Sequence, residues 1–167
     1  MNIDATIDLD ALHATIIAAI AAEFPALQTV EFYREDRTEV TAPACLLNLS
    51  EFEGDGEDPG TGQLAVMCRF EAEIIMGFRT PAAKQEIRKL CAAFSAFLHR
   101  ARWPGGRVTP AQDIHAYQSD FKPALDQYEV WTIEWKQGIN LGANVWAGEG
   151  VTPTTVFLGD VQIVPTP

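Results

Sequence analysis

The sequence predicts an α+β fold: a mixed, mainly antiparallel sheet with a long β-hairpin, two main helices packed on it, and an extended C-terminal arm. Three observations predict it. Residues 63–78 alternate between apolar and other side chains, which is typical of a strand with one face on a core. Segments 9–24 and 83–101 repeat apolar residues at helical spacing. Residues 141–167 are rich in Gly, Thr and Pro, which favours an extended arm.

The long strand is the best-defined element. Every even position from Leu64 to Phe78 is apolar, and the odd positions include Arg69, Glu71 and Glu73. A helix would place Arg69 and Glu73 on one face with Glu71 opposite, so the alternation excludes a helix. At ~3.3 Å per residue the segment extends about 53 Å, so it must bend, carry a bulge or project beyond its domain. We expect it to project.

The first helix is expected to start at a cap formed by Asp8 or Thr6 and to end near Phe24, because Pro25 cannot continue it. His13 is expected on its exposed or boundary side.

Short strands are expected at residues 29–34 and 44–52. Segment 53–62 contains Gly, Pro and four acids but no apolar residue, so we expect a mobile acidic loop at the tip of an extended hairpin.

The second helix is expected to begin with Thr80 as its cap and Pro81 in the first helical position, and to fold back over the apolar face of the long strand. An antiparallel pair of strands is expected at residues 111–118 and 127–137. We therefore expect a single α+β domain over residues 1–140. Residues 141–167 are an extension that ends in a hairpin paired with another sheet edge, or else a strand of its own sheet.

Composition limits the function classes. The chain has 167 residues and a net charge of −11, the opposite of what a protein that grips nucleic-acid phosphates requires. The acidic surface serves solubility, or lets DNA slide through a passage without sticking. No apolar run is long enough to span a bilayer, and the N-terminus lacks the pattern of a signal peptide. The three cysteines, far apart within apolar patterns, are expected to be buried thiols in a reducing cytoplasm.

Chemical motifs are few. The three histidines lie far apart, and no zinc-protease, phosphate-loop or nucleophile-elbow motif is present, so we expect no catalytic, cofactor-binding or metal-binding residues and no enzyme. Glu71 and Glu73 would permit acid–base catalysis. Beside Arg69 and Arg79, however, they are better explained as a charge ladder, a row of charged side chains that pairs with a neighbouring strand or subunit. The four tryptophans are expected to anchor the core and interfaces.

The order of these elements resembles tail terminator (tail-completion) proteins of long-tailed bacteriophages and prophages. The resemblance covers roughly residues 5–142 and is carried by a capped helix leading into FPALQTVEFYREDRTEV, then PACLLNLSEFE, the long strand, RTPAAKQEIRKLCAAFSAFLHRARWPG and QYEVWTIEWKQGINLG. It implies a small α+β virion protein, assembled in the bacterial host cytoplasm. Such a protein forms a ring, expected to be a hexamer, on the end of the tail tube and joins it to the head or neck.

The implied partners are other copies of the chain, the tail tube protein, the sheath protein in contractile tails, and a neck or connector protein. DNA passes through the lumen without specific binding. Two alternatives stay open: another neck or head-completion protein, such as a stopper or connector, and a small-molecule-binding α+β domain that uses a cavity between the sheet and the second helix. The candidate interface residues are Arg69, Glu71 and Glu73 on the long strand, Asp55, Glu57 and Asp58 at the loop tip, and Phe157 in the arm.

Overall fold

The structure is a computed structural model that describes residues 9–34, 40–103, 108–119, 127–142 and 144–146, and the backbone of 156–158 and 161–163. Its helices are α1 (Leu9–Glu23) and α2 (Ala83–Arg100). Its strands are β1 (Thr29–Phe32), β2 (Ala44–Gly54), β3 (Leu64–Gly77), β4 (Gln112–Gln118), β5 (Tyr128–Leu141), β6 (Val156–Leu158) and β7 (Val161–Ile163). The expected capping residues of α1, Thr6 and Asp8, lie outside the described residues.

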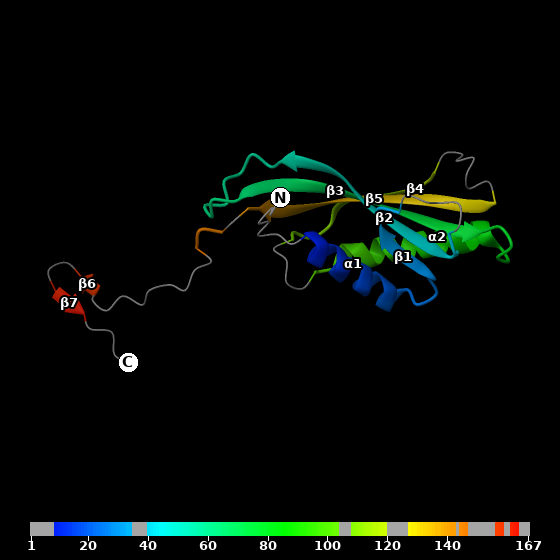
Figure 1. The fold of residues 1–167 in the computed structure, drawn as a ribbon, viewed down its shortest axis with the longest axis horizontal. Helices are drawn as coiled ribbons and strands as arrows, with labels where there is room; N and C mark the ends of the chain where they lie inside the picture. Colours follow the sequence, from blue (N-terminus) through cyan, green and yellow to red (C-terminus); the bar gives the residue numbers. More distant parts are fainter. Residues whose placement is uncertain are drawn as a thin grey trace.

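Five strands form one twisted sheet in the order β1-β2-β3-β5-β4 (Figure 1). β1 pairs with β2 in parallel, and every other pairing in this sheet is antiparallel. Both helices lie on the same side of the sheet (Figure 1). The predicted α+β class, with a mixed and mainly antiparallel sheet, a long hairpin and two packed helices, is confirmed.

The main core lies between the helices and the sheet. Both helices place their apolar stripes on the even-numbered face of β3, as their spacing predicts. Phe70 of β3 and Trp135 of β5 are fully buried and stack with ring centroids 5.4 Å apart. The same face of the sheet contributes Cys45, Leu47, Cys68, Phe70, Ala72, Ile74, Met76, Ile133, Trp135 and Ile139 to this core.

The β2–β3 hairpin both projects and carries a bulge. β3 pairs with β5 along its whole length, whereas the pairing of β2 with β3 shifts register between Leu49 and Glu51. Ser50 is the extra residue, and its hydroxyl donates to the carbonyl of Arg69. Figure 1 shows the hairpin tip extending past the ends of both helices. β1 covers the edge of β2 only from Ala44 to Leu47, so no strand of the described residues pairs with the outer edge of β2 beyond that point.

No helix of the described residues lies on the opposite face of the sheet, called the outer face below, but this face is not wholly exposed. Ile75 and Val130 are buried there against Val40, Ala44 and Leu46. The segment before β2 therefore covers one end of the outer face, and only the remaining part is available to water or a partner.

Two sequence predictions at element ends are wrong. Thr80 does not cap α2 with its side chain, and Pro81 is not in the first helical position. The N-cap is Ala82, in a left-handed conformation at φ 54°, without a side-chain hydrogen bond. The carbonyl of Thr80 instead accepts the backbone N–H of Ala83. The last long strand does not end at residue 137: β5 continues to Leu141, paired with β3 as far as Leu64. Thr109 lies so close to this strand that its hydroxyl accepts the N–H of Gly138 at 2.7 Å. A Cβ at Gly138 would lie 3.0 Å from Cγ2 of Thr109, so a glycine suits this contact.

His13 is buried, contrary to the exposed or boundary position expected from the helix pattern. Its ring stacks on Phe32 with centroids 4.0 Å apart, and Tyr33 meets it edge-on. Burial disfavours the imidazolium and lowers the pKa of His13 below the ordinary histidine value, although the charge of Asp10 opposes the shift. Strand β1, which follows α1 and carries Phe32, is what covers this residue.

The C-terminal extension ends in the hairpin expected of it. β6 and β7 pair antiparallel in a two-stranded sheet of their own and, within the described residues, contact no element of the main body. They are not an added strand of the five-stranded sheet. Neither described helix is both long and apolar enough to cross a lipid bilayer.

Candidate functional site: the outer sheet face and the hairpin tip

The outer face brings like charges together across the two central strands. Arg69 of β3 stands directly opposite Lys136 of β5, and Glu71 stands directly opposite Glu134. Like charges in opposite positions destabilise a sheet, so two such pairs in succession need neutralising groups from elsewhere.

The flanking strands neutralise the two bases and provide a hydrogen bond to one of the two acids. Nε of Arg69 lies 3.0 Å from a carboxylate oxygen of Glu51 on β2, and Lys136 lies 3.6 Å from Asp113 on β4. The hydroxyl of Tyr117 donates to Glu134. Arg69 of the predicted charge ladder thus pairs with a neighbouring strand of its own chain. No basic partner of Glu71 is found among the described residues.

A shallow pocket adjoins this ladder where β1 ends. It has a volume of about 210 Å³, and its lining includes Tyr33, Arg34, Asn48, Glu71 and Glu73. It is on the outer face and not between the sheet and α2, where the alternative ligand-binding hypothesis places a cavity. Small-molecule sites usually measure about 300–1,000 Å³, so this pocket is too small for most of them.

The hairpin tip carries the other predicted acids. Asp55, Glu57 and Asp58 are exposed, as expected. Asp58 accepts the backbone N–H of Gly60 and so shapes the turn. The tip lies away from the ladder of Arg69, Glu71 and Glu73, so the structure separates the candidate residues into two groups. The side chain of Phe157 lies outside the described residues; its backbone pairs with Gln162.

Trp146 docks on the hairpin tip, a contact that the sequence did not predict. Its indole N–H donates to the carbonyl of Gly60 at 2.8 Å, and the N–H of Val145 donates to the carbonyl of Thr61. Gln63 Nε2 donates to the carbonyl of Gly142, which fixes the chain leaving β5. The second half of the acidic loop, from Gly60 to Gln63, is therefore held by hydrogen bonds to the chain that follows β5. A lone tryptophan within a Gly-rich stretch was the only signal for this contact.

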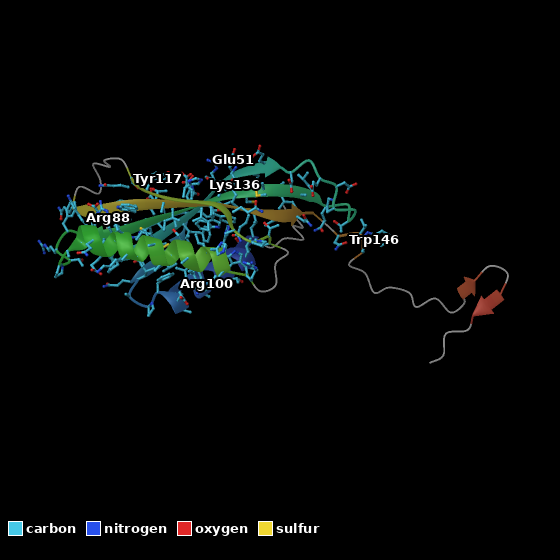
Figure 2. All side chains as sticks on the ribbon, turned by 180° about the vertical axis from the view of Figure 1, so that it is seen from behind. Glu51, Arg88, Arg100, Tyr117, Lys136 and Trp146 are labelled. Atoms are coloured by element: carbon cyan, nitrogen blue, oxygen red, sulfur yellow. The ribbon has the colours of Figure 1, made fainter. Side chains whose placement is uncertain are left out.

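The docked tryptophan remains largely exposed. Trp146 is 75% exposed, and Phe52 and Leu64 on the projecting hairpin are 49% and 60% exposed. Figure 2 shows Trp146 and Arg88 at opposite ends of the body formed by the helices and the five-stranded sheet. Exposed aromatic and aliphatic side chains held in place by backbone contacts are typical of protein interfaces. Of the four tryptophans, Trp103 and Trp135 are core residues, Trp131 is half-buried, and Trp146 is exposed beside the hairpin tip.

A buried carboxylate lies at the other end of the sheet. Glu129 is only 4% exposed, and the nearest basic group is Arg88 of α2, whose Nη1 lies 4.0 Å from Oε1. The same guanidinium lies over the ring of Trp131, 5.1 Å from its centroid. Arg88 thus ties α2 to β5 through both residues. No group of His, Cys, Asp or Glu in the described part of the chain is arranged to hold a metal ion.

Comparisons with known proteins do not assign the chain to a family. No protein-family model matches the chain, and no curated protein matches it. One solved structure among those that match is 16% identical, covers 81% of this chain and 96% of its own, and has a TM-score of 0.46. Its name states no function, and similarity at this level supports no functional argument.

Proposed function

We propose that this protein is a structural assembly protein that acts through its surfaces and catalyses no reaction. The observation that carries the proposal is the projecting hairpin: its tip exposes Phe52, Leu64 and Trp146 beyond the cover of the helices. Burying these side chains against a partner would contribute at most about 1.5–3 kcal/mol each, because Phe52 and Leu64 are already partly buried. The uncovered outer face adds a second, charged contact surface.

The particular role we propose is that of a tail terminator. The protein would form a homo-oligomeric ring on the last ring of a phage tail tube, stop polymerisation and present the joint to the head or neck. The order of elements from α1 to β5 is the order on which the resemblance to tail terminators depends. The acidic character of the chain suits a passage through which DNA moves without being held.

Deletion of the gene from the phage or prophage that carries it tests this role. We expect tails of irregular or excessive length that fail to join heads, measured in electron micrographs, and recovery of normal length when the gene is restored. Tails of normal length in the deletion strain would contradict the proposal. Normal tails that still fail to join heads would favour a stopper or connector instead.

The hairpin tip gives a sharper version of the same test. Trp146→Ser removes an exposed ring whose loss leaves the core untouched, whereas Trp135→Ser removes a core ring and serves as the contrasting variant. Complementation with Trp146→Ser is expected to give the long-tail phenotype from a stably folded protein. A folded Trp146→Ser protein that restores normal tails would show that the tip is not the contact surface.

A ligand-binding role has one observation in its favour, the polar pocket beside Glu71 and Glu73. It predicts a rise in melting temperature with a bound small molecule, which Glu71→Gln abolishes. A screen without any such rise would count against it.

A further inference from the structure

We propose that copies of this chain associate head to tail, with the acidic outer side of one copy docked on the exposed face of helix α2 of the next. The inference deepens the proposed function and depends on it, because it specifies how neighbouring subunits of the ring meet. The acidic surface comprises Glu51, Glu53, Glu71, Glu73 and Glu134 on the outer face and Asp55, Glu57 and Asp58 at the tip. The two bases on the outer face, Arg69 and Lys136, are paired with Glu51 and Asp113. The basic surface comprises Lys84, Arg88, Lys89, Arg100 and Arg102.

Charge is strongly segregated along the chain. Residues 51–73 hold seven carboxylates and one base, whereas residues 79–103 hold six bases and one carboxylate. The chain as a whole has a net charge of −11, so half of its twelve bases are gathered in one segment of an acidic protein. Complementary patches of this kind steer association and fix which surfaces meet.

The two surfaces cannot neutralise each other within one copy. Figure 2 shows Glu51 on the outer side of the sheet and Arg100 on the helix side, with the sheet between them. Among the described residues, Glu53, Asp55 and Glu57 have no basic partner, and Lys84 and Arg100 have no acidic one. Their charges are therefore available to a second copy.

The exposed face of α2 also has a suitable shape. Between its two groups of bases it exposes Ala92, Ala93 and Ala96, which allow a close approach of another backbone. Among the described residues, nothing covers the outer sheet face beyond the small cluster around Ile75, which leaves room for a helix to lie across it. Packing a helix on this face would give the sheet the second layer that it lacks in one copy.

This contact joins different surfaces of identical chains. Such a heterologous contact closes into a ring when the rotation between neighbours divides a full turn, and otherwise yields a filament. A ring subunit requires this kind of contact, whereas an isologous contact would stop at a dimer.

Paired charge reversal tests the proposal. The acidic-side variant is Glu53→Lys/Glu71→Lys, and the basic-side variant is Lys84→Glu/Arg100→Glu. Each alone is expected to weaken self-association about tenfold at low salt, as measured by sedimentation velocity. A 1:1 mixture of the two is expected to associate again, because every interface in an alternating assembly then joins opposite charges. Asp10→Lys/Glu23→Lys, on α1, changes the net charge as much as the acidic-side variant does, and it is expected to associate like wild type.

Cross-linking gives a second readout that detects weak contacts. A chain carrying Glu53→Cys is mixed with one carrying Arg100→Cys, and a short bis-maleimide is added; the native thiols are buried. Links between the two variants should exceed links within either one. Failure of the mixture to recover, together with no excess of mixed links, would overturn the head-to-tail contact. The tail-length phenotype of the gene deletion is independent of that result, so failure here leaves the terminator role to its own test.

Discussion

The indole N–H of Trp103 donates to Oε1 of Gln137 at 2.9 Å, and this bond joins positions 34 residues apart. The same oxygen accepts the indole N–H of Trp135, also at 2.9 Å, and the amide Nε2 donates to the carbonyl of Thr109. One buried amide thereby satisfies two tryptophans and a backbone carbonyl, and it fixes the chain after α2 against β5.

Replacing Gln137 by Leu is expected to lower the free energy of unfolding by about 2–5 kcal/mol, because two buried indole N–H groups lose their acceptor. Urea denaturation measures the change. Trp103→Phe is the control: it removes one donor and leaves the oxygen bonded to Trp135, so its cost should be smaller. A Gln137→Leu protein as stable as wild type would contradict the importance of this network.

His13 predicts a specific pH dependence of stability. Since its pKa is lowered in the folded state, the unfolded state binds more protons below the ordinary histidine pKa of about 6.5. The contribution of His13 to stability is therefore complete above that pH and is lost as the pH falls. Between pH 7 and pH 5, wild type should lose more stability than His13→Gln in chemical denaturation. His99→Gln, which replaces an exposed histidine, is the comparison variant; equal slopes for all three proteins would refute the assignment.

The three thiols are expected to be unreactive while the protein is folded. Burial raises the pKa of Cys68 to about 11 and that of Cys91 to about 12, and it also raises the pKa of Cys45. At pH 8 a thiol with a pKa near 11 is thiolate in roughly one molecule per thousand. A chromogenic disulfide reagent should thus label three thiols promptly in urea and almost none in buffer. Rapid labelling of the native protein would show that a cysteine is accessible.

The C-terminal extension should divide into a docked part and a separable part. Truncation after Trp146 is expected to change the free energy of unfolding by less than about 0.5 kcal/mol, because β6 and β7 contact no described element of the body. Truncation after Asn140 also removes Leu141, the cross-strand partner of Leu64, and the contacts of Trp146 with the tip. It should cost about 1–3 kcal/mol in urea denaturation. Equal stability of the two truncated chains would mean that the docked segment contributes nothing.

The sequence predicted the elements whose patterns are long. The alternation through β3 fixes its core face, and the apolar stripe of α2 fixes which side packs on the sheet, since both follow from backbone periodicity. The apolar periodicity did not predict the features that depend on tertiary contacts. The burial of His13 depends on β1, a strand of four residues, and the continuation of β5 through Gly138 depends on its pairing with β3.

The candidate site was predicted in part. The alternation of β3 placed Arg69, Glu71 and Glu73 on one face, but their cross-strand neighbours Glu51 and Glu134 depend on register, which a single strand does not specify. The docking of Trp146 on Gly60 joins residues 86 positions apart and has no local signature.

The extra residue at Ser50 has a consequence for the whole electrostatic pattern. Before it, odd-numbered residues of β2 lie on the core side of the sheet; after it, even-numbered ones do. Had the strand continued its simple alternation, Glu51 and Glu53 would turn toward the hydrophobic interior and Phe52 would stand among the charges. The bulge at Ser50 thus keeps Glu51 and Glu53 on the same face of the sheet as Glu71 and Glu73. A variant that lacks Ser50 would pair without the bulge and should keep every side chain of the hairpin on its present side.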